Sequence, residues 1–201
     1  MLKEKIKFTL STLSYLWILF AVPILFLALT PQWYYINYGL QDNSQLLNST
    51  TQITQTNNLV GFFTYKQTLN SKWSITESQH MADVRVLYSL LFLGILGFGI
   101  LLNFTLKKEY ILGITKITYG ILLLLLPIMF VFSWFWDNIF HTVLFSNDYW
   151  IMTPKDLSFY LFSDMFFLRS MIVIVLIMII INTITYRITT KKISKIKSKK
   201  H

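Results

Sequence analysis

The segment VLYSLLFLGILGFGILLNFTL, residues 86–106, decides the fold, because it carries no charged residue from end to end. A hydrocarbon core of about 30 Å is crossed by roughly 20 residues of α-helix. The segment is apolar all round rather than along one stripe, which is typical of a helix surrounded by other apolar groups. It therefore predicts a transmembrane helix.

Three further apolar segments have nearly the same length and composition: residues 8–30, 116–136 and 165–186. The whole chain is 54% hydrophobic and only 13% charged, about half the charged share of a soluble domain. We predict an all-α integral membrane protein with four transmembrane helices in a single domain, residues 1–201. The first segment also resembles a signal peptide, but its apolar stretch exceeds the usual ~7–15 residues, so we expect it to be retained.

The net charge of +9 is distributed unevenly across this topology. Residues 1–7, 107–116 and 187–201 hold thirteen basic and two acidic residues, a net of +11. The remaining segments hold five basic and seven acidic residues, a net of −2. Because basic residues stay on the cytoplasmic side, both termini are predicted to be cytoplasmic. The polybasic tail, residues 187–201, is predicted to lie beside anionic lipid, and the basic residues do not indicate a nucleic-acid partner.

Two segments are then extracytoplasmic: residues 31–85, an insert between the first two helices, and residues 137–164. The insert contains short apolar patches in an almost uncharged sequence, which is consistent with a small folded unit containing a strand or two, or with a flexible loop. The sequence leaves the fold of residues 40–75 open. The insert is expected to become helical towards the membrane, where Thr76 or Ser78 is the expected helix cap.

The scarce histidines indicate where chemistry occurs. His80 shares a helix face with Glu77 and Asp83, and His141 follows Asp137 by one helical turn. A carboxylate beside an imidazole can fix the tautomer and leave the other ring nitrogen to act as a base. Two alternatives stay open: the polar residues merely end the helices, or the histidines and carboxylates bind zinc.

Other chemistry is excluded or unsupported by the sequence. The chain has no cysteine, which excludes disulfides and thiol nucleophiles. It also lacks the G-x-S-x-G and S-x-x-K motifs of serine hydrolases.

Two stretches resemble the lipoprotein intramolecular transacylase family, Lit: ESQHMADVRVLY, residues 77–88, and FHTVLFSNDYWIMTPKDLSFYLFSDMFF, residues 140–167. The resemblance implies a monomeric acyltransferase in the cell membrane of a Gram-positive bacterium, with its active site on the extracytoplasmic side. It implies transfer of the sn-2 acyl chain of a diacylglyceryl lipoprotein to the α-amine of its N-terminal cysteine, which gives the lyso form. No cofactor or metal is implied, and the partners are the lipoprotein and membrane lipid.

The same resemblance, together with the chemistry, assigns candidate residues. We expect His80 to be the base, Asp83 to orient it, and His141 to be a hydrogen-bond donor or second proton carrier. The two histidine roles could be exchanged, and an acyl-histidine intermediate stays open. Substrate binding or oxyanion support is expected from Arg85, Asn147, Asp148 and Trp150. The alternatives are a non-enzymatic accessory or sensor protein and a metal-dependent membrane hydrolase.

The charge asymmetry predicts the outcome of a topology experiment. Reporter fusions after Lys108 and at the C-terminus should report a cytoplasmic location, because both sites follow basic segments. Fusions at Asn57 and Pro154 should report the opposite side. A C-terminal reporter outside the cytoplasm would contradict the four-helix topology.

Overall fold

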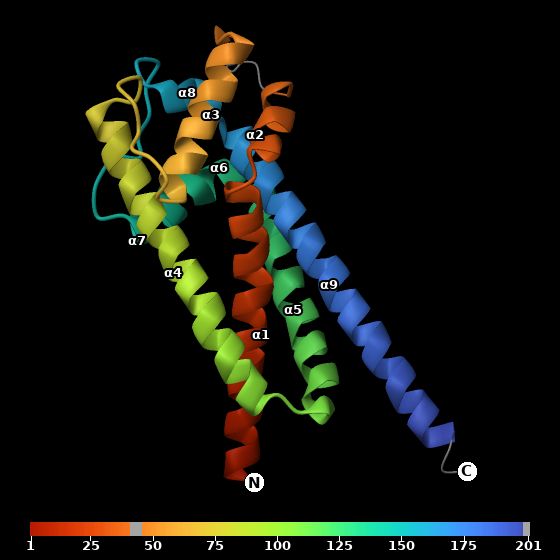
Figure 1. Ribbon diagram of the computed structural model, residues 1–201. Coiled ribbons are helices and arrows are strands. Elements are labelled where there is room, and N and C mark those ends of the chain that lie inside the picture. The colour runs from red at the N-terminus through yellow and green to blue at the C-terminus, as the bar shows by residue number, and fades with distance from the viewer. Residues whose placement is uncertain (41–45, 199–201) are drawn as a thin grey trace. The chain divides into compact units, whose positions relative to one another are not determined.

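The structure is a computed structural model that describes residues 1–40 and 46–198, with side chains described for all of these except Asp164 and residues 192–198. All of the regular structure in the described part of the chain is helical (Figure 1). The chain folds into two compact units. The first comprises residues 1–23, 91–127 and 173–201, and the second comprises residues 24–90 and 128–172.

In the part of the chain that the structure describes, four helices are long and apolar enough to cross a membrane, which confirms the predicted number. They are α1 (Leu2–Ala28), α4 (Ile75–Thr105), α5 (Ile111–Phe130), preceded by the short helix η2 (Lys108–Tyr110), and α9 (Asp164–Ser198). Helix α4 begins eleven residues before the apolar segment that predicted it, so its first three turns carry the polar residues of the insert. Residues 199–201 of the polybasic tail, with His201, lie outside the described residues.

Small polar side chains are buried in the first unit, where they link its helices. The hydroxyl of Ser11 donates to that of Thr105 (3.0 Å). Tyr15 donates to Oδ1 of Asn182 (3.1 Å), and Nδ2 of Asn182 donates to the carbonyl of Thr115 (3.0 Å). In a membrane such pairs hold helices together where apolar burial supplies little driving force between them.

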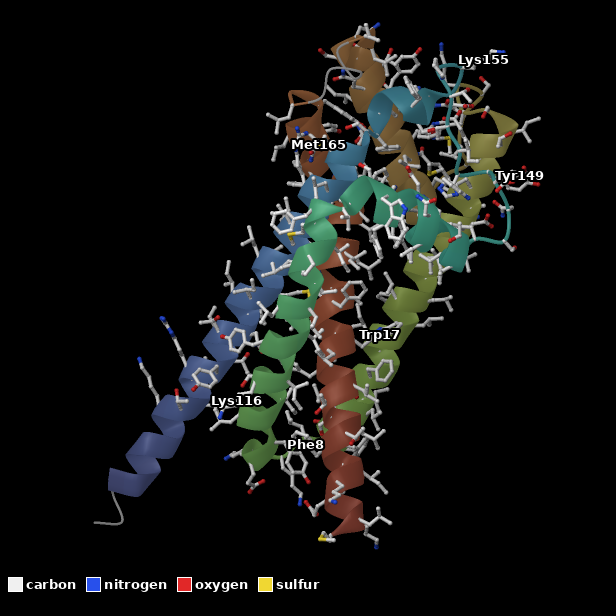
Figure 2. The ribbon with its side chains drawn as sticks, turned by 180° about the vertical axis from the view of Figure 1, so that it is seen from behind. Phe8, Trp17, Lys116, Tyr149, Lys155 and Met165 are labelled. Carbon is white, nitrogen blue, oxygen red and sulfur yellow. The ribbon has the colours of Figure 1, made fainter. Side chains whose placement is uncertain are left out.

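A glycine brings two helices of the first unit close together. The indole of Trp17, labelled in Figure 2, fills the space where a Cβ of Gly94 would lie, only 2.2 Å from the indole nitrogen. Trp17 also packs on Phe98, one turn further along α4 (5.3 Å between ring centroids). Any side chain at position 94 would displace Trp17.

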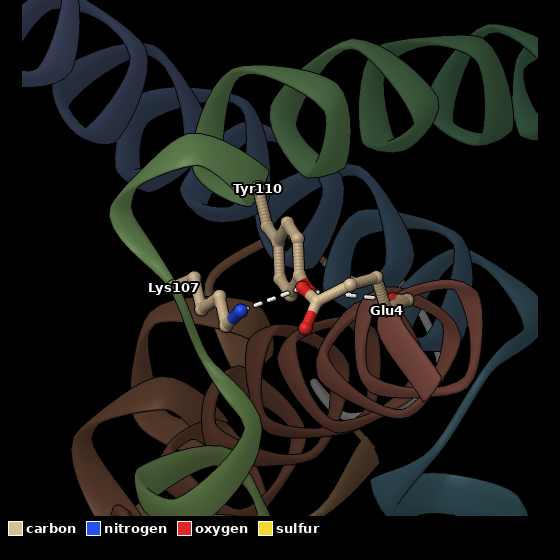
Figure 3. Close-up of polar contacts among 3 residues, drawn as sticks. All are labelled: Glu4, Lys107 and Tyr110. Atoms are coloured by element: carbon tan, nitrogen blue, oxygen red, sulfur yellow. Dashed lines mark hydrogen bonds and ion pairs between the residues drawn. The ribbon is translucent and has the colours of Figure 1, made fainter. Parts of the chain in front are cut away.

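The N-terminal end of α1 is fixed to the α4–α5 connection by one carboxylate (Figure 3). Glu4 accepts hydrogen bonds from Lys107 (2.6 Å) and from the hydroxyl of Tyr110. Lys107 precedes η2 and Tyr110 is its last residue, so the short turn between α4 and α5 is held at the same end of the first unit.

The described part of the insert is helical, which is neither the strand or two nor the flexible loop that the sequence left open. It forms α2 (Pro31–Tyr38) and α3 (Ser49–Phe63), with Asn48 capping α3 by accepting from the N–H of Thr51 (2.8 Å). The short apolar patches recur with helical spacing, which places them on one face of α3. The buried residues of that face are Gln55, Thr56, Leu59, Val60, Phe62 and Phe63.

The core of the second unit is largely aromatic. Its buried members are Tyr34, Tyr38, Leu59, Val60, Phe62, Phe63, Trp73, Met81, Leu161 and Phe166. The segment after α5 adds α6 (Phe132–Phe135), the π-helical turn η3 (Trp136–Phe140), α7 (His141–Leu144) and α8 (Leu157–Leu161). These short helices pack with α2, α3 and the first turns of α4 to form the unit that carries both histidines.

Helix α4 begins with a capping box that reaches across the second unit. Ser74 is the cap, rather than the predicted Thr76 or Ser78: its hydroxyl accepts from the N–H of Glu77 (3.2 Å), and its N–H donates to the Glu77 carboxylate (2.8 Å). The other carboxylate oxygen accepts from both the N–H and the hydroxyl of Ser158 in α8 (2.6 Å each). The buried Glu77 side chain, which is only 1% exposed, thus accepts hydrogen bonds from N–H groups at the starts of two helices.

Replacement of this carboxylate should destabilise the protein strongly. In Glu77→Ala the N–H groups of the partly buried Ser74 and the buried Ser158 lose their acceptor, at a cost of about 1–3 kcal/mol for each group where it stays shielded from water. We expect the thermal transition in detergent to fall by roughly 5–10 °C for a chain of this size. Glu109→Ala, which removes an exposed carboxylate without a hydrogen bond, is the matched control. Equal transition temperatures for the two variants would contradict this role of Glu77.

Candidate functional site

The two histidines of the second unit lie close together, although 61 positions separate them in sequence. His80 comes from the second turn of α4 and His141 from the start of α7, and their ring centroids are 6.1 Å apart. Each is only 7% exposed. Phe145 packs against both rings, with centroid distances of 4.8 Å to His80 and 5.8 Å to His141. The sequence prediction that both histidines belong to one site is consistent with this geometry.

The backbone fixes the orientation of His141. Its Nδ1 lies 2.8 Å from the carbonyl oxygen of Trp136, which also accepts the backbone N–H of His141 across the π-helical turn. A carbonyl can only accept, so Nδ1 carries the proton. Nε2 is therefore the basic nitrogen of the neutral ring. This carbonyl performs the orienting role that was expected of a carboxylate.

His80 has a different environment. Its buried Nδ1 has no hydrogen-bond partner among the described residues. Asp83, which was expected to orient it, instead accepts a hydrogen bond from Nδ2 of Asn147 (3.1 Å). Burial penalises the charged form of an imidazole, so the neutral ring is favoured at this position. His80 thus keeps hydrogen-bonding capacity that a bound molecule could use.

Trp150 covers one face of His141. The two rings are stacked, with centroids 4.5 Å apart and an interplanar angle of 17°. Trp136 contacts the same imidazole edge-on at 4.9 Å. Trp150 follows a turn in which the N–H of Tyr149, labelled in Figure 2, donates to Oδ1 of Asn147 (3.1 Å). The same asparagine therefore contacts α4 and shapes the turn before Trp150.

The loop between α7 and α8, residues 145–156, is fixed at its far end by Asp156, the residue that precedes α8. Its carboxylate accepts from the hydroxyl of Ser74 (3.0 Å) and from both the N–H and the hydroxyl of Thr153 (2.9 and 2.8 Å). Burial raises the pKa of Asp156, but the hydrogen bonds from Thr153 and Ser74 outweigh it and hold the pKa below its usual value. Both ends of the loop are thereby attached to the first turns of α4.

Two cavities meet at the histidine pair. The smaller, of about 140 Å³, is lined almost entirely by apolar and aromatic side chains from α2, α3, α4 and α9, including Leu59 and Phe63. The larger, of about 550 Å³, lies beside Trp150 and includes Asp137 and Ser163 in its lining. His80, Met81, Trp136, His141, Phe162 and Phe167 line both. The two rings therefore lie between a smaller, apolar cavity and a wider, more polar one.

Four predicted site residues line neither cavity: Asp83, Arg85, Asn147 and Asp148. The guanidinium of Arg85 lies over the rings of Phe62 (4.0 Å) and Tyr65 (4.5 Å) at the end of α3. Asp148 is exposed. Trp136 and Phe145, by contrast, contact the histidines and were not singled out from the sequence. Nothing in the sequence marks a backbone carbonyl or a lining aromatic residue as functional.

The zinc alternative would need several converging ligand side chains. Within residues 1–40 and 46–198, no group of three histidine, aspartate or glutamate side chains converges in a way that could hold an ion. The arrangement can instead accept a proton at His141, offer a hydrogen bond at His80, and accommodate an apolar chain beside them.

Comparison with known proteins identifies the relatives of this chain. The family model described as lipoprotein intramolecular transacylase Lit matches residues 8–167. No curated protein sequence matches. The fold is similar to that of the membrane-integral lipoprotein intramolecular transacylase Lit from Bacillus cereus, with a TM-score of 0.84 and 19% identity over 96% of this chain and 98% of that one.

Two structures of variants of the same Bacillus cereus protein also match. One, with a histidine-to-arginine substitution, has a TM-score of 0.82 and 17% identity over 98% of this chain and 94% of that one. The other, with a histidine-to-alanine substitution, has a TM-score of 0.76 and 18% identity over 97% and 96%. Because the family model covers most of the sequence, the chain belongs to the lipoprotein intramolecular transacylase family and is a membrane-integral transacylase.

Proposed function

We propose that this protein moves the sn-2 acyl chain of a diacylglyceryl lipoprotein to the α-amino group of its N-terminal cysteine, on the extracytoplasmic side of the cell membrane. The observation that carries the proposal is the pair of buried imidazoles, 6.1 Å apart, at the junction of an apolar and a more polar cavity. Ester, amine and acyl chain of one substrate would meet at such a junction.

The fixed tautomer of His141 supports its role as the general base. The geometry therefore favours His141 as the base and His80 as the hydrogen-bond donor, which exchanges the roles first expected of them. Nε2 of His141 would take a proton from the α-amine as the nitrogen attacks the ester carbonyl carbon. An N-terminal amine has a pKa near 8, so much of it is already neutral near that pH and needs only this one proton transfer.

His80 is suited to stabilise the charge that develops on the ester oxygen. Its ring is buried and its Nδ1 is unpaired, so a hydrogen bond to the tetrahedral intermediate replaces no existing bond at that atom. Collapse of the intermediate breaks the bond to the glycerol sn-2 oxygen, which takes the proton from the His141 imidazolium. The products are an amide and a free sn-2 hydroxyl, and no covalent enzyme intermediate is required.

The two cavities fit the two parts of the substrate. The smaller cavity suits the first carbons of the acyl chain, because its lining is almost wholly apolar. The larger suits the glycerol and the peptide N-terminus, and Asp137 in its lining would attract an ammonium group. Trp150 belongs to this second cavity. Arg85 is better placed to attach α3 to α4 by cation–π contacts than to bind substrate.

The product distinguishes intramolecular transfer from its alternatives. A lipopeptide with two distinguishable acyl chains should keep its total mass on incubation with the protein, while its sn-2 chain appears on the cysteine nitrogen by tandem mass spectrometry. A gain of one acyl group would indicate a phospholipid donor, and a loss of one would indicate a hydrolase. Either result would overturn the proposal.

Glutamine substitutions separate the two histidine roles, because an amide can donate a hydrogen bond but is not a base. His141→Gln should lose about 10²–10⁴ in the rate constant for transfer, as expected for a lost general base. His80→Ala should lose about 10²–10³, while His80→Gln should recover part of that loss.

The rate constants are measured on variants that elute as monodisperse peaks in detergent, with His201→Ala as the control expected to match the wild type. The opposite pattern, with activity recovered only in His141→Gln, would assign the base to His80.

A further inference from the structure

Asp83 is a carboxylate three residues from His80 on α4, and it makes its hydrogen bond to a loop residue instead. It accepts from Nδ2 of Asn147 (3.1 Å), and both side chains are partly buried. Hydrogen bonds to an ionised acceptor are about twice as strong as neutral ones. Because α4 also positions His80, this bond places Asn147 relative to the same helix that carries the first histidine.

Both polar ends of the Asn147 amide are in use. Nδ2 donates to Asp83, and Oδ1 accepts the N–H of Tyr149, which forms a side-chain turn immediately before Trp150. The next side-chain anchor of the loop is at Thr153 and Asp156. Asn147 is therefore the side-chain anchor nearer to Trp150, and it fixes the position of the backbone just before that residue.

Trp150 meets His141 face to face, at 4.5 Å and 17°. A cation over the face of an indole is stabilised by about 0.5–2 kcal/mol, and tryptophan is the most effective ring for this. Such a contact has its largest effect when the partner ring becomes charged in a place that excludes water. A base that takes a proton during the reaction becomes charged in this way.

We propose that Asp83 acts through Asn147 to hold the indole of Trp150 against His141, and that the indole face stabilises the imidazolium formed during acyl transfer. Asp83 and Asn147 are then positioning residues of the His141 side of the site. The inference rests on the proposed function for the origin of the imidazolium. The hydrogen bonds of Asn147 to Asp83 and Tyr149, and the stack of Trp150 on His141, do not depend on that function.

An exchange of the two side chains tests the inference. In Asn147→Asp two carboxylates face each other, so the turn should move and the rate constant for transfer should fall about 10- to 100-fold, as expected for a misplaced catalytic group. Asp83→Asn should be mild, because its amide oxygen can still accept. The double variant Asp83→Asn, Asn147→Asp restores a donor and an acceptor and should recover to within about threefold of Asp83→Asn.

The same variants have a spectroscopic readout that needs no substrate. The ring protons of His141 lie over the indole and should resonate upfield in the wild type. They should move downfield in Asn147→Asp and in Trp150→Leu, and should return upfield in the double variant. Asn48→Asp, which keeps a good cap on α3, is the control for an asparagine-to-aspartate change and should alter neither readout.

Two results would overturn the inference. If Asp83 serves His80 directly, Asp83→Asn will be the more damaging single change and the double variant will stay inactive. If the His141 resonances are the same in all variants, Asn147 does not hold the stack. Failure of the proposed function is distinguishable, because the wild-type protein would then form no N-acylated product while the resonances still followed the exchange.

Discussion

The second unit is governed by the requirement that polar groups enclosed by aromatic side chains must find partners. Glu77 accepts hydrogen bonds at the starts of α4 and α8, and Asp156 accepts them at the end of the loop. The amide of Asn147 donates to α4 and accepts a hydrogen bond within its own turn. The carbonyl of Trp136 likewise accepts from Nδ1 of His141. Among the described residues of this unit, His80 Nδ1 is one of three buried exceptions, with Oδ1 of Asn37 and Nη1 of Arg169, and it belongs to a side chain that lines both cavities.

The same pairing explains how a short, irregular stretch can be held precisely enough for chemistry. Residues 131–163 contain only brief helical turns and a loop, which have little stability of their own. Their attachment to α4 at Ser74, Glu77 and Asp83 transfers the rigidity of a 31-residue helix to the side chains that surround His141. Catalytic groups need such support because small displacements cost large factors in rate.

Much of this organisation could be predicted from the sequence, and the remainder has physical reasons. The four long helices follow from apolar length, and His80 and His141 were identified because histidine is scarce in the chain. The role of Asp83 could not be read from spacing, because positions i and i+3 share a helix face whether or not they bond. The role of the Trp136 carbonyl could not be predicted, because a π-helical turn leaves no clear sequence pattern. Helix α3 could not be predicted either, because the helical period of its short apolar patches is not evident in the sequence.

We propose that the Trp136 carbonyl holds the His141 proton on Nδ1 and leaves Nε2 as the basic nitrogen, beside the buried imidazole of His80. The most direct test is ¹⁵N NMR of the histidine-labelled protein in detergent, with His141 assigned by His141→Gln. We expect a protonated Nδ1 and an unprotonated Nε2 for His141 at neutral pH. A proton on Nε2 instead, or a ring that is already cationic at that pH, would contradict it.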